Sequence, residues 1–141
     1  MILAAAETGR RIRAGDLVIR PYAAECQQPA SYDLRAAEDT TLRRGGCTLV
    51  HSCEWVELPA DIAGTLRCRS SFGRRGVLIG GGFVDPGFRG QLTLCLVNMG
   101  DADVPVIAGE RVVQLILHAV KGGDRLYDGR YQDSTGAVNA R

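Results

Sequence analysis

Glycine recurs between short apolar segments along this chain, and that spacing constrains the fold more than any other feature. Glycine accounts for 18 of the 141 residues, nearly twice the average share of ~7%. Glycine disfavours helix interiors and supplies turns that need a positive φ. The apolar segments recur at intervals of roughly ten residues, which is typical of a sandwich or barrel of antiparallel strands. The sequence therefore predicts an all-β domain with many turns and few helices.

Local patterns place the elements of this domain. Residues 4–14 predict one short helix that ends at Gly15, because glycine readily adopts the left-handed conformation of a helix C-cap. The polar, glycine-containing stretch 121–141 has no apolar periodicity, so we expect a flexible C-terminal tail. We treat residues 1–141 as a single domain, with residues 1–15 as its N-terminal helical segment. The predicted strands are 16–20, 47–51, 54–58, 63–67, 91–97, 104–107 and 111–117.

Charge and composition exclude several function classes. The net charge is only +1, from 17 basic and 16 acidic residues without long runs of one sign. Duplex nucleic acid and anionic membranes call for a basic surface, so neither is an expected partner. The longest nearly apolar run, 112–120, is far shorter than the ~20 residues of a membrane helix. The start of the chain lacks a basic secretory n-region, so we expect a cytoplasmic protein.

Cysteine usage gives no sign of a disulfide framework or a zinc site. There are five cysteines, an odd number, and no pair has the C-x-x-C spacing. We expect them to act mainly as small hydrophobic side chains.

Residues 69–74 combine two arginines with two serines directly after a predicted strand. Guanidinium groups match phosphate oxygens, and hydroxyls with backbone amides at a strand-to-helix turn complete an anion cradle. Arg69, Ser70, Ser71 and Arg74 are therefore candidate phosphate ligands. The same residues also fit a capped helix start with solvated arginines, and the pattern alone leaves both interpretations open.

Residues 83–90 form a turn around Asp85-Pro-Gly, preceded by three glycines at 80–82. The glycines permit a ligand to approach the backbone, whose amide and carbonyl groups can read the edge of a base. Asp85 is a candidate to orient or deprotonate a water, and Phe88 offers a ring face to a sugar or base. The alternative is a structural hairpin with an Asx-turn at the aspartate.

Two polar residues lie in segments that read as buried strands. Gln114 is central in 111–117, and Asp33 lies in the apolar stretch 31–34. A buried amide or carboxylate needs a polar partner. Another subunit, a metal-bound water and a neighbouring backbone group all fit, and the residues do not separate these options.

Taken in order, these segments resemble the dUTPase and dCTP deaminase superfamily over nearly the whole chain. Segments 14–21, 28–35, 56–62, 69–74 and 129–136 resemble the dCTP deaminase branch, whereas 84–90, 109–115 and 134–136 resemble dUTPase motifs. The resemblance implies a dUTPase-like β-barrel or jelly-roll-type fold. It also implies a homotrimer in which several subunits form each site, which covers strand edges that a lone domain would expose.

The resemblance also bears on the reaction. The deaminase branch carries a glutamate in a motif resembling L-E-x-x-N, and residues 94–98 have Cys95 in that place. A thiol with a pKa near ~8.5 is a poor proton shuttle at neutral pH. Asp85 matches the aspartate that activates water against the α-phosphorus in dUTPases. The sequence thus favours a dUTP diphosphatase that forms dUMP and diphosphate. The alternatives are a dCTP deaminase, forming dUTP or dUMP, and a catalytically silent nucleotide-binding homologue.

The same resemblance assigns expected roles around a pyrimidine deoxynucleoside triphosphate. Mg²⁺ is expected on the triphosphate and its waters, with Asp33 as a candidate support for that water shell. The tail 121–141 is expected to act as a lid that excludes water. Expected phosphate ligands are Arg69, Ser70, Ser71, Arg74, Gln114 and Arg130. Expected base and sugar contacts are Gly82, Phe83, Val84, Phe88, Tyr131 and Gln132.

Overall fold

Side chains on the long strands alternate between buried and partly exposed positions, as expected for sheets with one face on a core. The computed structural model describes all 141 residues. The alternation is clearest in β9 (Arg89–Asn98), where every second side chain from Gly90 onward is buried. It also holds over most of β5 (Cys47–Glu57) and β11 (Arg111–Ala119). The expected all-β class is confirmed, and no helix is long and apolar enough to cross a bilayer.

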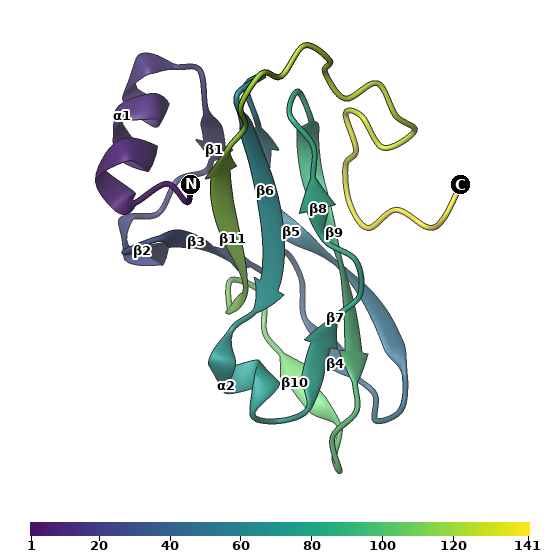
Figure 1. The fold of residues 1–141 in the computed structure, drawn as a ribbon. Coiled ribbons are helices and arrows are strands. Elements are labelled where there is room, and N and C mark those ends of the chain that lie inside the picture. Colours follow the sequence, from purple (N-terminus) through teal and green to yellow (C-terminus); the bar gives the residue numbers. More distant parts are fainter.

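Two antiparallel sheets and one two-stranded ribbon make up the fold (Figure 1). The first sheet has the order β1-β5-β9-β7, with β1 (Val18–Arg20) and β7 (Val77–Ile79) at its edges. The second has the order β2-β3-β11-β6-β8. Its other strands are β2 (Gln27–Gln28), β3 (Ser31–Arg35), β6 (Ile62–Cys68) and β8 (Phe83–Val84). The ribbon pairs β4 (Thr40–Leu42) with β10 (Val104–Val106). Buried side chains of both sheets belong to one apolar cluster, so the sheets enclose a common core.

The helices are short. The expected N-terminal helix is present as α1 (Ala5–Ala14), and Gly15 ends it with a φ of 83° while donating its N–H to Arg11 and Ile12 carbonyls. The others are α2 (Ser70–Gly73) and a single 3₁₀ turn, η1 (Ala24–Cys26). Figure 1 shows α1 and the C-terminal tail on opposite sides of the sheets.

The strand predictions need two corrections. The separate strands expected at 47–51 and 54–58 are one strand, β5, because pairing with β9 resumes after a register shift between His51 and Trp55. The short strands β2, β4, β7 and β8 were not predicted. They have only two or three residues each, which is too short for a period of two to emerge.

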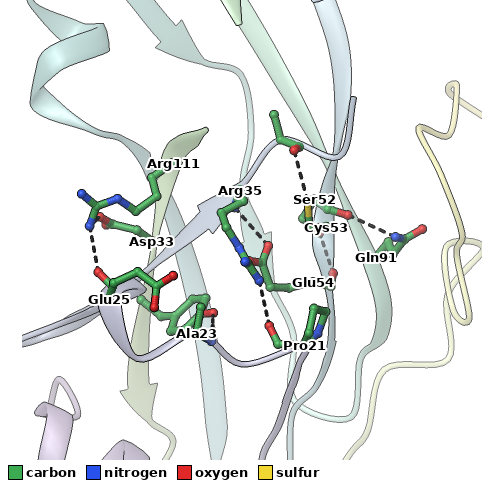
Figure 2. A network of polar contacts seen from close by, with 12 residues as sticks. Pro21, Ala23, Glu25, Asp33, Arg35, Ser52, Cys53, Glu54, Gln91 and Arg111 are labelled. Atoms are coloured by element: carbon green, nitrogen blue, oxygen red, sulfur yellow. Dashed lines mark hydrogen bonds and ion pairs between the residues drawn. The ribbon is translucent and has the colours of Figure 1, made fainter. Parts of the chain in front are cut away.

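A buried ion pair joins the two sheets (Figure 2). Glu54 on β5 is fully buried, and its carboxylate accepts hydrogen bonds from Arg35 Nε at 2.7 Å and from the Arg35 amide at 3.0 Å. Arg35 Nη2 also donates to the Pro21 carbonyl at 2.9 Å. The hydrogen-bonded carboxylate raises the pKa of the Arg35 guanidinium. This pair ties β3 of one sheet to β5 of the other.

Removing the negative charge of this pair should destabilise the fold. In Glu54→Gln the Arg35 cation loses its counter-charge, so we expect the free energy of unfolding to fall by about 3 kcal/mol. Urea denaturation measures this change. The control is Glu7→Gln, which removes an exposed partner of Arg10 at 2.6 Å and should leave the midpoint unchanged. Equal midpoints for both variants and the parent would contradict a stabilising role.

Candidate functional site

Three glycines carry the chain from one sheet to the other. Residues 80–82 connect β7 to β8. The Gly80 amide donates to the Cys95 carbonyl on β9 at 2.8 Å, and the Gly82 carbonyl accepts from the Leu66 amide on β6 at 2.7 Å. This crossing is therefore fastened to both sheets.

The crossing requires glycine for two physical reasons. Gly81 and Gly82 have φ values of 74° and 107°, which side chains rarely adopt. A Cβ on Gly82 would lie 2.9 Å from Leu66 Cβ, whereas one on Gly81 would meet nothing within 4 Å. The amides of Gly81 and Gly82 have no hydrogen-bond partner in the protein. They are available as donors to a ligand.

The Asp-Pro-Gly turn leaves its carboxylate free. The Phe88 amide donates to the Asp85 carbonyl at 3.1 Å, and the Gly87 amide donates to the Leu58 carbonyl at 2.9 Å. The Asp85 side chain is exposed and takes part in none of the hydrogen bonds or ion pairs within the protein. The turn is thus held by backbone groups, without the Asx-turn that was the structural alternative. A free carboxylate of this kind can accept a proton from water.

A cavity of about 480 Å³ lies beside the crossing and the turn. Eleven of its 18 lining residues are hydrophobic, and Asp85 is the only one with a charged side chain. The residues expected to contact base and sugar line it, with the exception of Gln132. They are Gly82, Phe83, Val84, Phe88 and Tyr131. The volume suits a small organic ligand.

The aromatic rings at the cavity differ in exposure. Phe88 is only 8% exposed and packs edge-on against Tyr127, with ring centroids 5.7 Å apart. Phe83 is 64% exposed. Phe88 was the ring expected to contact the sugar. Phe83 has the larger exposed ring surface of the two.

Cys95 lines the same cavity from β9 and is half-buried. Burial raises the pKa of the Cys95 thiol, so the thiol stays protonated at neutral pH. It adds polarizable surface to the cavity but no proton shuttle suited to that pH.

The C-terminal tail lies along β9 and forms one wall of the cavity (Figure 1). The Gln91 amide donates to the Ser134 carbonyl at 2.8 Å, and Gln91 Oε1 accepts from the Gly136 amide at 2.7 Å. Thr93 Oγ1 accepts from the Val138 amide at 3.0 Å. Although the tail lacks regular structure, its backbone is docked by alternate side chains of β9. Gln91 and Thr93 were not predicted as site residues, yet the period of two in segment 91–97 places them on one face with Cys95.

Gln132 does not line the cavity. Its side-chain Nε2 donates to the Gly87 carbonyl at 2.8 Å, and its side-chain Oε1 accepts from the Arg89 amide at 2.9 Å. Gln132 therefore holds the tail to the turn, outside the lining of the cavity in this protomer.

None of the expected phosphate ligands lines the cavity. Arg69, Ser70, Ser71 and Arg74 lie at the start of α2 and directly after it, just past the C-terminal end of β6, whereas Asp85 follows β8 toward the other end of β6. Val84 pairs with Gly64 on β6, and Arg69 lies five residue steps after Gly64, a span of roughly 16 Å at a rise of ~3.3 Å per residue. One protomer therefore divides the expected site into a cavity with Asp85 and a cationic cluster at α2.

The two remaining phosphate candidates have other partners. Gln114 Nε2 donates to Ser31 Oγ at 3.3 Å. The Arg130 guanidinium donates to the Arg141 carbonyl within the tail. No three His, Cys, Asp or Glu side chains lie close enough to hold a metal ion.

Comparison with known proteins gives consistent matches. Residues 36–120 match the family described as dCTP deaminase-like. A dCTP deaminase from Pyrococcus horikoshii is 34% identical over 139 residues, covering 87% of this chain and 89% of the relative.

Two solved structures have a similar fold. The native dUTPase of EIAV superposes with a TM-score of 0.66 at 21% identity, covering 82% of this chain and 98% of that one. The 2′-deoxycytidine 5′-triphosphate deaminase of Agrobacterium tumefaciens gives a TM-score of 0.71 at 20% identity, covering 82% and 47%. At these identities the likeness is one of fold.

Substitutions in the crossing should separate backbone strain from crowding. Gly81→Ala introduces only the cost of a side chain at positive φ, about 1–2 kcal/mol of unfolding free energy. In Gly82→Ala the new methyl group also displaces Leu66, so we expect a further loss of about 1–3 kcal/mol. Urea denaturation of both variants tests this order. A Gly82→Ala protein as stable as Gly81→Ala would contradict the close contact.

Proposed function

The chain belongs to the dCTP deaminase-like family within the dUTPase/dCTP deaminase superfamily, and from that premise we propose that it is an enzyme that hydrolyses dUTP to dUMP and diphosphate. One observation carries the choice of reaction. Asp85 is the only carboxylate that lines the cavity, and its carboxylate group makes no hydrogen bond or ion pair within the protein. The cavity thus has one base suited to activating a single water.

Asp85 supplies the chemistry of hydrolysis. Its carboxylate takes a proton from a water that attacks the α-phosphorus, and the bond from that phosphorus to the bridging oxygen breaks. Diphosphate then leaves and dUMP remains. Such displacements depend mainly on positioning and on neutralising phosphate charge. Mg²⁺ bound to the triphosphate supplies part of that neutralisation and needs few protein ligands.

The crossing favours uracil. The free amides of Gly81 and Gly82 are hydrogen-bond donors, and they suit carbonyl oxygens, of which the uracil ring has two and the cytosine ring one. The exposed ring of Phe83 offers a stacking surface for the nucleoside. The tail, already docked on β9, closes the cavity from the other side.

A complete site requires more than one copy of the chain. Arg69, Ser70, Ser71 and Arg74 remain the proposed phosphate ligands, but they lie at the opposite end of β6 from Asp85. We propose that a homotrimer brings the α2 cluster of one copy to the cavity of another, with Arg130 of the tail as a further cation.

Deamination of dCTP is the second candidate, and the names of the relatives favour it. The Pyrococcus horikoshii relative is named a dCTP deaminase, which supports deamination more directly than hydrolysis. The residues of the cavity disfavour deamination, because that reaction needs a group that moves protons between water and the ring. The Cys95 thiol has a pKa raised by burial, and losing one acid-base group costs about 10²–10⁴ in rate.

Product analysis separates the candidates. The protein is incubated with dUTP and dCTP separately, with and without Mg²⁺, and the products are resolved by chromatography. We expect dUMP and diphosphate from dUTP, and only with Mg²⁺. Conversion of dCTP to dUTP or dUMP with release of ammonia at an enzymatic rate would establish deamination instead. Tight binding without turnover would identify a silent homologue.

Replacing the proposed base should separate chemistry from binding. Asp85→Asn keeps the shape of the side chain but cannot accept the proton, so we expect kcat for dUTP to fall by about 10²–10⁴ with little change in nucleotide affinity. Calorimetry with a non-hydrolysable dUTP analogue measures the affinity. The control is Asp16→Asn, which removes an exposed carboxylate paired with Arg11 outside the cavity and should hydrolyse dUTP normally. Full activity of Asp85→Asn would refute the role of Asp85.

A further inference from the structure

Asp33 is the most deeply buried carboxylate near the α2 cluster. Its side chain is 1% exposed, and neither carboxylate oxygen accepts a well-aligned hydrogen bond. Two guanidinium groups flank it, with Arg69 Nε at 3.0 Å and Arg111 Nη1 at 3.6 Å from Asp33 Oδ2. Figure 2 shows Arg111 beside Asp33.

The sheet register brings these three residues together. Asp33 on β3 lies opposite Gln114 on β11, which lies opposite Arg67 on β6. Arg111 begins β11, where a register shift occurs, and the Arg69 amide donates to the Val112 carbonyl at 3.1 Å. The close approach of Asp33, Arg69 and Arg111 therefore depends on the pairing of β11 with β3 and β6.

The carboxylate of Asp33 and the guanidinium groups of Arg69 and Arg111 differ in charge and in exposure. One carboxylate faces two cations, so the cluster keeps a net positive charge. The buried carboxylate lies inside, whereas the side chains of Arg69 and Arg111 remain 30% and 36% exposed. Burial raises the pKa of the Asp33 carboxyl, and the two arginines oppose that rise. The excess positive charge is therefore at the surface, beside Ser70 and Ser71.

Each arginine is also restrained by a backbone group. Arg111 Nη1 donates to the Glu25 carbonyl at 2.8 Å, and Arg69 Nη1 donates to the Arg111 carbonyl at 3.4 Å. A free arginine loses considerable rotamer entropy when it grips a ligand. Arginines already held by a buried carboxylate lose less, and their remaining N–H groups are left to donate to a ligand.

We propose that Asp33 is a positioning residue that holds Arg69 and Arg111 as a two-guanidinium clamp for phosphate oxygens, which adds Arg111 to the phosphate-binding residues. That the bound phosphates belong to a nucleoside triphosphate rests on the proposed function. The clamp itself requires only a polyphosphate anion. Arginine forks are suited to such anions because each can donate two parallel hydrogen bonds.

This role replaces the one expected for Asp33 at a metal's water shell. The carboxylate is almost completely covered, so a metal-bound water has little access to it. Two guanidinium groups within 3.6 Å also disfavour a divalent cation at that place.

Binding of inorganic tripolyphosphate to the purified full-length protein tests the clamp without any turnover. We expect calorimetry to give an affinity at least about tenfold lower for Asp33→Asn and for Arg111→Gln. The control is Asp61→Asn, which removes the carboxylate from an Arg11 pair of 2.7 Å outside the site and should bind normally. Unchanged binding in Asp33→Asn and Arg111→Gln would overturn the proposal.

Kinetics distinguish positioning from metal support. Asp33→Asn should raise KM for dUTP at least about tenfold while kcat changes much less, because the clamp acts on binding. The Mg²⁺ concentration for half-maximal rate at saturating nucleotide should stay constant. A raised Mg²⁺ requirement with normal tripolyphosphate affinity would overturn the clamp in favour of a metal role.

Two further outcomes are decisive. If Asp33→Asn fails to fold, Arg111→Gln carries the test, because its side chain lies at the surface. Weaker tripolyphosphate binding at an unchanged Tm supports the clamp, and normal binding overturns it. If the parent protein turns over neither dUTP nor dCTP but its tripolyphosphate binding depends on Asp33, the proposed function fails while the clamp stands.

Discussion

The candidate site depends on one backbone crossing between the two sheets. Gly80 is hydrogen-bonded to β9 and Gly82 to β6, and the close approach at Leu66 leaves no space for a side chain at Gly82. This crossing forms one wall of the cavity and leads into the turn that carries Asp85. The tail completes the opposite wall by docking on alternate residues of β9. If the crossing shifted, the cavity, the Asp85 carboxylate and the tail would no longer face one another.

The charged side chains define two candidate functional regions. The cavity contains a single carboxylate and no cation, which suits an uncharged base and one activated water. The α2 region holds a buried carboxylate between two arginines, which suits a polyanion. The net charge of +1 does not indicate this division, because it sums over charged side chains that lie in different parts of the molecule. Since the arginines at α2 do not line the cavity in one protomer, the proposed reaction needs neighbouring copies to bring the two regions together.

Prediction from sequence succeeded where a signal is local and repeated. The period of two identified the strands that became β6, β9 and β11, and Gly15 marked the end of α1. It failed at β7 and β8, which have three and two residues, and at the register shift inside β5. Among site residues, Asp85 and the glycines were recognisable from the turn they form. Asp33 was recognised as a buried carboxylate, but its arginine partners were not, because they come from strands distant in the sequence.

By itself, the sequence determined the all-β class, the helix end at Gly15, the Asp-Pro-Gly turn and a thiol at position 95. Each of these follows from residue chemistry within a few neighbouring positions. Only the tertiary structure decided that Arg69 lies beside Asp33 rather than Asp85, that Gln132 holds the turn, and that the tail closes the cavity. The physical reason is that these contacts depend on strand register and on the length of β6. Those quantities are set by packing across the whole core.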